Sequence, residues 1–350
     1  MPELAQRFSS NPLISPKDVR PSAPGLEVEC VLNPGVFRYN GQTGLVLRVA
    51  ERPPETERAI KVPVLNPAAP DGIEILSFAK DDPELDLSDP RLFSYQGRTY
   101  LTTVSHLRLA WSDNGTDFAI DERATLTGEG PLESFGIEDC RVSAVADEYV
   151  LTYAAVSPHG VGVNMIRTSD WKQFQREGMI FAPENKNTAV FEETIGGRYW
   201  AFHRPSNVNF KGNHIWVASS PDLTHWGGHA CIAMVRPGQW DETRMGAAAA
   251  PVRTEHGWLA LYHGADRHNR YCLGALLLDY GDPTRVLARS TDPIMEPTAS
   301  YEREGFFGGV VFANGHVVDG DTLTIYYGAA DTVVCGASFS VREILASLGR

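Results

Sequence analysis

The feature that most constrains the fold of this chain is a short turn followed by an alternating aromatic and aliphatic segment, which recurs six times. The starts of these segments lie 56, 50, 50, 59 and 65 residues apart. A period of this size is typical of a β-propeller blade built from four short strands. The six segments are GQTGLVLRV from Gly41, GRTYLTTVSH from Gly97, DEYVLTYAAVS from Asp147, GRYWAFHRPS from Gly197, HGWLALYHGAD from His256 and DTLTIYYGAAD from Asp321.

Several of these segments are followed by a strand, a Ser-Asp or Pro-Asp turn, an aromatic residue and a return strand, as in LRLAWSDNGTDFAI, NMIRTSDWKQFQREG and IWVASSPDLTHWGG. Such turns use Asp and Ser side chains to bond the backbone. We therefore predict an all-β fold, a single five-bladed β-propeller over residues 1–350 with its active site in the central funnel. Six segments fit five blades if the first and the last share closure of the ring. Six narrower blades, or a pair of two-sheet sandwiches, are the alternatives.

The ends of the chain receive their own predictions. Residues 1–30 are expected to form an N-terminal extension or a closing segment. Residues 341–350, VREILASLGR, are expected to form a short C-terminal helical turn.

Composition excludes several classes of function. The chain has 31 basic and 44 acidic residues, a net charge of −13, which argues against a nucleic-acid or anionic-membrane partner. No apolar run approaches the length of a membrane span, and no signal peptide is visible. The five cysteines are scattered and odd in number, which predicts reduced thiols and a cytoplasmic protein. No zinc spacing and no dinucleotide fingerprint occur, so we expect no metal and no cofactor. The oligomeric state stays open, a homo-oligomer included.

Charged residues interrupt the apolar strands at equivalent places in different repeats. A charge in a packed strand is costly unless it is paired or functional. The first strands of a propeller line its funnel, so these residues are candidates for a common site. They are Arg48 in LVLRV, His203 and Arg204 in YWAFHRP, His263 in LALYHGAD and Asp331 in YYGAAD. Two carboxylates beside arginines, Asp89 in SDPRL and Asp139 in IEDCR, are either salt bridges at turns or a catalytic acid.

The order and spacing of these motifs resemble glycoside hydrolase family 130, the β-mannoside phosphorylases and β-mannosidases. The likeness runs from about Asn33 to the C-terminus. It is carried by NPGV at 33–36, DPRLF at 89–93, GIEDCR at 136–141, ENKN at 184–187, HRPS at 203–206, SPDLTHWG at 220–227, GWLALYHG at 257–264 and YYGAAD at 326–331.

The resemblance implies a five-bladed propeller with a mannoside site in the funnel and Asp139 as the proton donor. In this family the proton is thought to pass through the 3-hydroxyl of the mannose to the glycosidic oxygen. Cys140 stands where the family has a proline, which leaves the placement of Asp139 open. The residues that resemble the family's phosphate contacts are Lys186, Arg204 and His263. Candidates for sugar contacts are Arg48, Asp89, Arg141, Tyr262 and Asp331.

The sign of the charges in the site separates the two reactions of the family. A phosphorylase must hold a phosphate dianion with basic residues, whereas a hydrolase needs a carboxylate base for water. We predict an inverting phosphorylase that converts a β-mannoside and inorganic phosphate, its co-substrate, into α-mannose 1-phosphate and a shortened sugar. The alternative is an inverting β-mannosidase, for example on β-1,2-mannosides, with Glu242 or Glu193 as base; Glu192 is a weaker candidate.

Two more distant alternatives remain at this point. A furanosidase-type propeller would use Asp89, Asp139 and Glu242, and would leave the three basic residues unexplained. A non-catalytic carbohydrate-binding propeller would use aromatic faces alone. The linkage and the acceptor sugar depend on loops such as RPPETER at 52–58 and NVNFKGN at 207–213.

Overall fold

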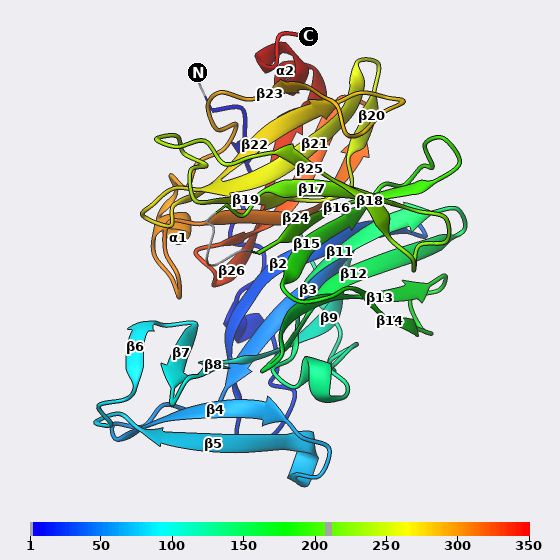
Figure 1. Ribbon diagram of the computed structural model, residues 1–350. Helices are drawn as coiled ribbons and strands as arrows, with labels where there is room; N and C mark the ends of the chain where they lie inside the picture. Colours follow the sequence, from blue (N-terminus) through cyan, green and yellow to red (C-terminus); the bar gives the residue numbers. More distant parts are fainter. Residues whose placement is uncertain (1–2, 207–211) are drawn as a thin grey trace.

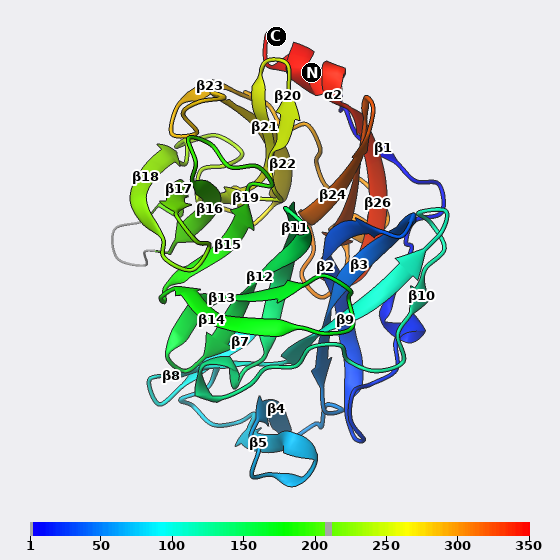
Figure 2. The same ribbon diagram turned by 90° about the vertical axis from the view of Figure 1, so that its right-hand side faces the viewer.

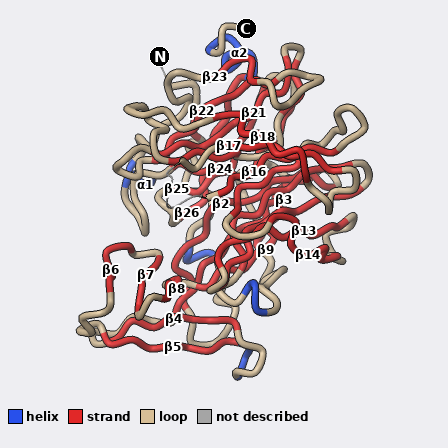
Figure 3. Tube along the Cα trace, in the orientation of Figure 1, coloured by secondary structure: helices blue, strands red, loops and turns tan. Residues whose placement is uncertain are grey.

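The regular elements of the structure, a computed structural model that describes residues 3–206 and 212–350, are almost all β-strands (Figures 1 and 3). The α-helices are α1 (Ser300–Arg303) and α2 (Val341–Ser347), and short 3₁₀ turns occur at Pro16–Asp18, Pro70–Gly72 and Pro131–Glu133. Helix α2 begins at Ser340, whose hydroxyl accepts a hydrogen bond from the Glu343 amide. No helix in the described ranges has the length and apolar character that crossing a membrane requires. The all-β prediction is confirmed.

Five antiparallel sheets contain most of the residues that lie in strands, and they follow one another along the chain. The first contains β2 (Glu27–Tyr39), β3 (Gln42–Arg52), β9 (Val104–Ser112) and β10 (Ala119–Ile120). The second contains β11 (Ile137–Val145), β12 (Glu148–Ser157), β13 (Gly160–Thr168) and β14 (Gln175–Phe181). The third contains β15 (Asn185–Val190), β16 (Tyr199–Pro205), β17 (Ile215–Ser220) and β18 (Gly227–Ala233).

The last two sheets follow the same plan with small additions. The fourth contains β19 (Arg244–Ala247), β21 (Gly257–Ala265), β22 (Tyr271–Leu278) and β23 (Val286–Arg289), and β20 (Val252–Thr254) pairs with β21. The fifth contains β24 (Val311–Asp319), β25 (Thr322–Ala329), β26 (Val333–Ser340) and the N-terminal strand β1 (Gln6–Arg7). In each sheet the strand that comes first after the preceding sheet lies toward the middle of the molecule (Figure 2).

The N-terminal strand completes the last sheet. Gln6 of β1 pairs with Ser338 of β26, and the Arg7 guanidinium binds the buried Glu302 carboxylate, with Nε donating to Oε1 at 2.7 Å. The expectation that the first and last of the six sequence segments share closure is wrong. The segment from Gly41 forms β3 in the first sheet, and the segment from Asp321 forms β25 in the fifth.

The segment from Gly97, which makes six segments out of five sheets, belongs to an insertion between β3 and β9. Here β4 (Ala59–Leu65) pairs with β5 (Ile73–Ala79), and β6 (Asp86–Asp89), β7 (Leu92–Tyr95) and β8 (Arg98–Leu101) form a three-stranded sheet. We call residues 53–103 the arm, which projects below the other sheets in Figure 1. The segment from Gly97 forms β8 and the start of β9, so it opens no sheet of its own. Of the two loops expected to decide linkage, 52–58 leads into the arm, and residues 207–211 of the other lie outside the described residues.

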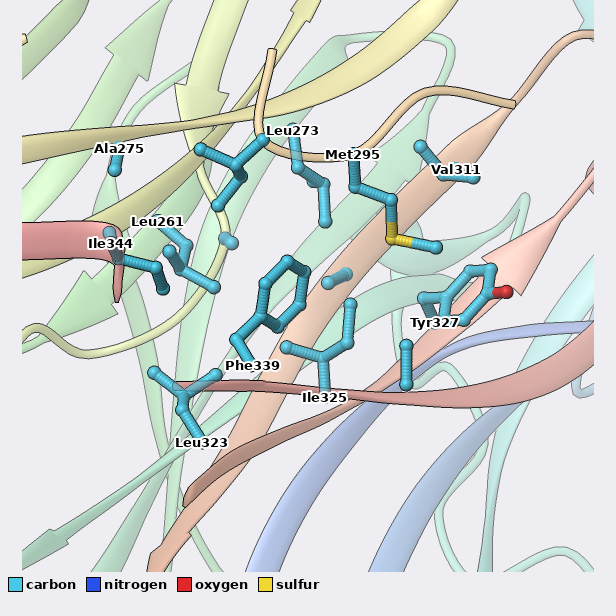
Figure 4. Close-up of a cluster of buried hydrophobic side chains, with 14 of the residues drawn as sticks. Leu261, Leu273, Ala275, Met295, Val311, Leu323, Ile325, Tyr327, Phe339 and Ile344 are labelled. Carbon is cyan, nitrogen blue, oxygen red and sulfur yellow. The ribbon is translucent and has the colours of Figure 1, made fainter. Parts of the chain in front are cut away.

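Apolar clusters fill the space between neighbouring sheets. Alternation along each strand presents one set of side chains to each face of the sheet, and both faces are covered. The cluster between the fourth and fifth sheets includes Leu261, Leu273, Ile325 and Phe339 (Figure 4). Similar clusters lie between the first and second, second and third, third and fourth, and fifth and first sheets. Each of the five sheets therefore packs against two others.

Candidate active site

A cavity of about 270 Å³ opens where the inner strands of the sheets come together. Strands β2, β3, β11, β15, β16, β19, β22 and β24 contribute to its wall, together with the arm and the segment before β24. Carboxylates and cations from separate elements face it together. The charged residues that line it are Glu138, Asp139, Asp331, Arg48, Arg91, Lys186, Arg204 and Arg244.

Four of the inner strands change register by a β-bulge, and each bulge carries an Asn or Asp. Asn33 on β2, Asp139 on β11 and Asn187 on β15 have φ values of 43°, 52° and 55°. Asn and Asp tolerate this left-handed region better than other non-glycine residues, which explains the residue type. Asn314 occupies the fourth bulge, on β24. Each is followed three residues later by a valine, namely Val36, Val142, Val190 and Val317.

The predicted acid Asp139 is held by hydrogen bonds to one of its two oxygens. Its Oδ1 accepts from Asn33 Nδ2 at 3.0 Å and from Arg48 Nη1 at 3.1 Å. The same guanidinium donates from Nη2 to Glu138 Oε1 at 2.7 Å. Asn33 is itself held, because its backbone carbonyl accepts a hydrogen bond from Asn314 Nδ2 at 3.0 Å. Arg48, predicted as a sugar contact, therefore lines the cavity and bridges two carboxylates.

The three carboxylates of the cavity differ in their pKa values. Burial raises the pKa of Glu138 above its usual value, and burial also raises the pKa of Asp331 to about 6. For Asp139, burial is opposed by the charges of Arg48 and Arg141 and by the Asn33 hydrogen bond, which together hold its pKa below the usual value. Among the protein's own groups, Asp139 is therefore the ionised member of its pair with Glu138.

A basic cradle faces these carboxylates. Lys186 and Arg204 line the cavity as predicted, and Arg244, which we did not predict, joins them. Burial lowers the pKa of Lys186 to about 8 and that of Arg204 to about 10, because charged side chains lose hydration there. Arg244 donates from Nη1 to Tyr271 Oη at 3.1 Å. In the described part of the chain, the buried Nε atoms of Arg204 and Arg244 have no hydrogen-bond partner, which suits an anion site.

His263 lies behind this cradle rather than on the cavity wall. It is fully buried, and its Nε2 lies 3.1 Å from Nδ2 of Asn187, which lines the cavity. Burial and the neighbouring arginines hold the pKa of His263 well below its usual value, so the imidazole is neutral. With the Asn187 amide as donor, the proton of the ring is on Nδ1, which has no partner among the described residues. His263 is thus a neutral donor rather than a cation.

Besides His263, three further residues predicted for the site lie away from the cavity. Tyr262 is fully buried, donates from its hydroxyl to Asp241 Oδ2 at 3.0 Å and stacks on Trp240. Glu242 accepts from Gly238 N and Arg267 Nε outside the cavity. Glu193 pairs with Arg253 at 2.7 Å and lines a second cavity of about 380 Å³. The structure therefore places the two candidate bases, Glu242 and Glu193, and the predicted sugar contact Tyr262 away from the cavity.

Glu192, the weaker candidate base, also lines the second cavity, and its Oε1 accepts from the Ala144 amide at 2.9 Å. That cavity lies at the other ends of β2, β11 and β24, near Phe37, Val142 and Val317. The glutamates on which the hydrolase reading depended are thus remote from Asp139.

Arg141 and Asp89 have positions different from those expected of sugar contacts. The buried Arg141 donates to the carbonyls of Ala247 and Ala248 and, from Nη1, to that of Asp139, each at 3.0 Å. It therefore ties the strand of the acid to the fourth sheet. Asp89 forms a bidentate pair with Arg91, with distances of 3.0 and 2.8 Å, and only Arg91 lines the cavity.

Cys140, which stands where the family has a proline, is buried beside Asp139. Its side chain is fully buried in the apolar cluster between the first and second sheets, and burial raises the pKa of its thiol. The bulge residue beside it is fixed from the other side by Asn33 and Arg48. Asp139 is thus held by side-chain contacts of its own, next to a Cys140 that packs into the apolar cluster.

Comparisons with known proteins agree with this site. A family model described as beta-1,4-mannooligosaccharide phosphorylase, of glycoside hydrolase family 130, matches residues 80–350. The chain is 46% identical over 347 residues to a beta-1,2-mannobiose phosphorylase of Listeria innocua, covering 98% of both chains. It is 34% identical to a 1,2-beta-oligomannan phosphorylase of a Thermoanaerobacter species, covering 69% of this chain and 80% of that one.

A solved structure extends the likeness to three dimensions. The Listeria innocua beta-1,2-mannobiose phosphorylase, determined in complex with beta-1,2-mannobiose, superimposes with a TM-score of 0.96 at 45% identity and covers 99% of both chains. The motifs, the arrangement of the site and these matches lead to one conclusion. The chain belongs to glycoside hydrolase family 130.

Proposed function

We propose that this chain is an inverting β-mannoside phosphorylase that cleaves β-1,2-linked mannobiose with inorganic phosphate. The products are α-mannose 1-phosphate and mannose. The observation that carries the proposal is the cradle of Lys186, Arg204 and Arg244, which faces the acid Asp139 across one cavity. The linkage follows from the likeness to a beta-1,2-mannobiose phosphorylase over nearly the whole chain.

We infer that the five sheets are the blades of one five-bladed propeller spanning the whole chain. Two observations support this inference. Each sheet packs through an apolar cluster against two others, in the cyclic order first, second, third, fourth, fifth and back to first. Strand β1 also pairs with β26, so the two ends of the chain share one sheet. The cavity then lies at one mouth of the central funnel.

In the mechanism that this arrangement supports, Asp139 acts as general acid toward the leaving oxygen. Phosphate, held by Lys186, Arg204 and Arg244, attacks the anomeric carbon from the opposite face, which inverts the configuration. Arg48 and Asp331 have positions suited to contact the sugar hydroxyls. Charge-assisted hydrogen bonds from fixed donors stabilise the dianion without reorganisation.

The cavity favours phosphorolysis over hydrolysis. A hydrolase needs a carboxylate base on the side of the sugar opposite the acid. In the described residues, the carboxylates lining the cavity are Glu138, Asp139 and Asp331, and Arg48 bridges the first two. The remaining wall near Arg204 is basic and would hold an anion in that position.

Incubation with β-1,2-mannobiose, with and without inorganic phosphate, tests the proposal. We expect α-mannose 1-phosphate and mannose in equal amounts only when phosphate is present, identified by proton NMR of the anomeric signals. Release of free mannose alone, at the same rate without phosphate, would contradict phosphorolysis. β-1,4-mannobiose serves as the linkage control and should react more slowly, because the likeness favours the β-1,2 linkage.

A pH dependence follows from Lys186. Burial, assisted by the charge of Arg204, lowers its pKa to about 8, so the ammonium is charged at pH 7 and largely neutral at pH 9. We expect the KM for phosphate to rise about tenfold between pH 7 and pH 9, because only the charged form attracts the dianion. Initial rates at varied phosphate measure this.

The matched control is Lys186→Arg, whose guanidinium stays charged throughout this range. It should flatten the alkaline rise in KM while leaving the neutral value within a few-fold. An equal alkaline rise in both proteins would remove Lys186 as its origin.

A further inference from the structure

A general acid has to carry a proton, yet the groups around Asp139 hold it as a carboxylate. Its Oδ1 accepts from Asn33 Nδ2 at 3.0 Å and from Arg48 Nη1 at 3.1 Å. Two donors on one oxygen, one of them a guanidinium, stabilise the charged form. Asn33 is fixed in turn by the hydrogen bond from Asn314 to its carbonyl. The proton must therefore reach Asp139 at some point in the catalytic cycle.

The charged groups that face Asp139 come from every element around it. Arg48 on β3, Arg141 on β11 and the cradle cations Lys186 on β15 and Arg204 on β16 favour the carboxylate. Glu138 on β11 and Asp331 after β25 oppose it by like charge. Lys186 also attracts Glu138 and Asp139 and is repelled by Arg204 and Arg48. The cradle and the acid thus form one electrostatic unit.

We propose that the binding of phosphate in the cradle loads the proton onto Asp139, so that the enzyme gains its general acid only when the nucleophile is in place. This inference rests on the proposed function of the site. A dianion offsets most of the positive charge of Lys186, Arg204 and Arg244, so the cradle stabilises the Asp139 carboxylate less, which favours the neutral carboxylic acid. The proton comes from solvent and binds Oδ2, because Oδ1 already holds two donors.

The step balances over one turnover. The proton on Oδ2 goes to the leaving oxygen as the bond from C1 to that oxygen breaks, and a phosphate oxygen forms the new bond to C1. The phosphate monoanion ester that results releases its remaining proton to solvent, and Asp139 returns to the carboxylate. Coupling of this kind would suppress hydrolysis, because without the anion Asp139 has no proton to donate to the mannoside.

Sulfate is a suitable probe of the coupling because, unlike phosphate, it stays a dianion between pH 5 and pH 8. Calorimetric titration with sulfate at pH 6, in two buffers of different ionisation enthalpy, counts the protons taken up. At pH 6 Lys186, with its pKa of about 8, is already charged and contributes little. We expect about half to one proton per sulfate, and a sulfate affinity about 3- to 10-fold weaker at pH 7 than at pH 6.

Two variants identify the group that takes the proton. In Asp139→Asn the uptake should vanish while sulfate still binds. Asp331→Asn is the matched control, because Asp331 is the competing carboxyl with a pKa of about 6, and its uptake should persist. Uptake near zero in the wild type, or unchanged uptake in Asp139→Asn, would overturn the inference.

If Asp139→Asn does not fold, infrared difference spectra of the wild type should show a protonated carboxyl band on sulfate addition, and its absence would overturn the inference as well.

The same experiment separates this inference from the proposed function. Arg204→Gln should weaken sulfate binding at least tenfold, and sulfate should compete with phosphate in the wild-type reaction. Failure of both would overturn the phosphate cradle, and the loading of Asp139 with it. Sulfate that binds and competes without proton uptake would overturn the loading alone and leave phosphorolysis intact.

Discussion

Asp139→Asn is expected to lower kcat/KM for the phosphorolysis of β-1,2-mannobiose by about 10²- to 10⁴-fold, the usual scale for the loss of a general acid. The amide cannot supply the proton, but it can still accept the hydrogen bonds from Asn33 and Arg48. Asn also tolerates the φ of 52° at this bulge, so the backbone should be preserved. Initial rates with phosphate and mannobiose measure the effect.

Glu242→Gln is the matched control for this variant. It makes the same carboxylate-to-amide change at a residue that bonds Gly238 and Arg267 outside the cavity. Its kcat/KM should stay within about twofold of the wild type, because substitutions remote from the active site and the core usually have small effects. Turnover of Asp139→Asn at a comparable rate would contradict the assignment of the acid.

Asp241→Ala is expected to give the largest loss of stability, about 3–5 kcal/mol in the free energy of unfolding. The Asp241 carboxylate is fully buried and accepts from Arg236 Nε at 3.0 Å, from Arg236 Nη2 at 2.7 Å and from Tyr262 at 3.0 Å, and it also pairs with Arg289. Without it, two guanidinium groups lose their common partner next to the fourth sheet. Urea unfolding followed by tryptophan fluorescence measures the change.

Glu193→Ala provides the comparison, because it also removes the acidic partner of an arginine. Its pair with Arg253 is exposed, with side chains that retain 48% and 62% of their surface. Solvent screening limits such a pair to about 0–1 kcal/mol. Equal losses in the two variants would show that the buried network around Asp241 is not what stabilises this region.

The error at Tyr262 shows where strand patterns are ambiguous. The sequence places Tyr262 and His263 next to each other on one strand, and both were chosen for the site. Successive side chains on a strand point to opposite faces, so only one of the two can face the neighbouring Asn187. The structure places His263 there and packs Tyr262 between the third and fourth sheets. Alternation predicts that the two side chains point to opposite faces of the sheet, but it does not predict which of them faces the site.

The segment from Gly97 shows a second limit of strand patterns. Residues 97–106 carry the same local pattern as the true sheet segments, because a turn and an alternating strand suit an insertion as well as a sheet. Only the long-range pairing of β3 with β9, which bypasses the whole arm, shows that this segment opens no sheet of its own. An Asn or Asp three residues before Val marks four inner strands, at Asn33, Asp139, Asn187 and Asn314. The same spacing at Asp147 and Asp331 leads into β12 and β26 instead, so this pattern alone does not identify the inner strands.

The sequence by itself determined the all-β class, the repeating hairpins and the family, and it predicted Asp139 as the acid, because these depend on local alternation, turn chemistry and ordered motifs. The tertiary structure decided that Arg244 lines the cavity with Lys186 and Arg204, that Glu193 and Glu242 lie elsewhere, and that Asp139 is held as a carboxylate. Those properties depend on which charges from distant strands face one another in a buried cavity. Coulomb and desolvation energies act through space, so no spacing along the chain encodes them.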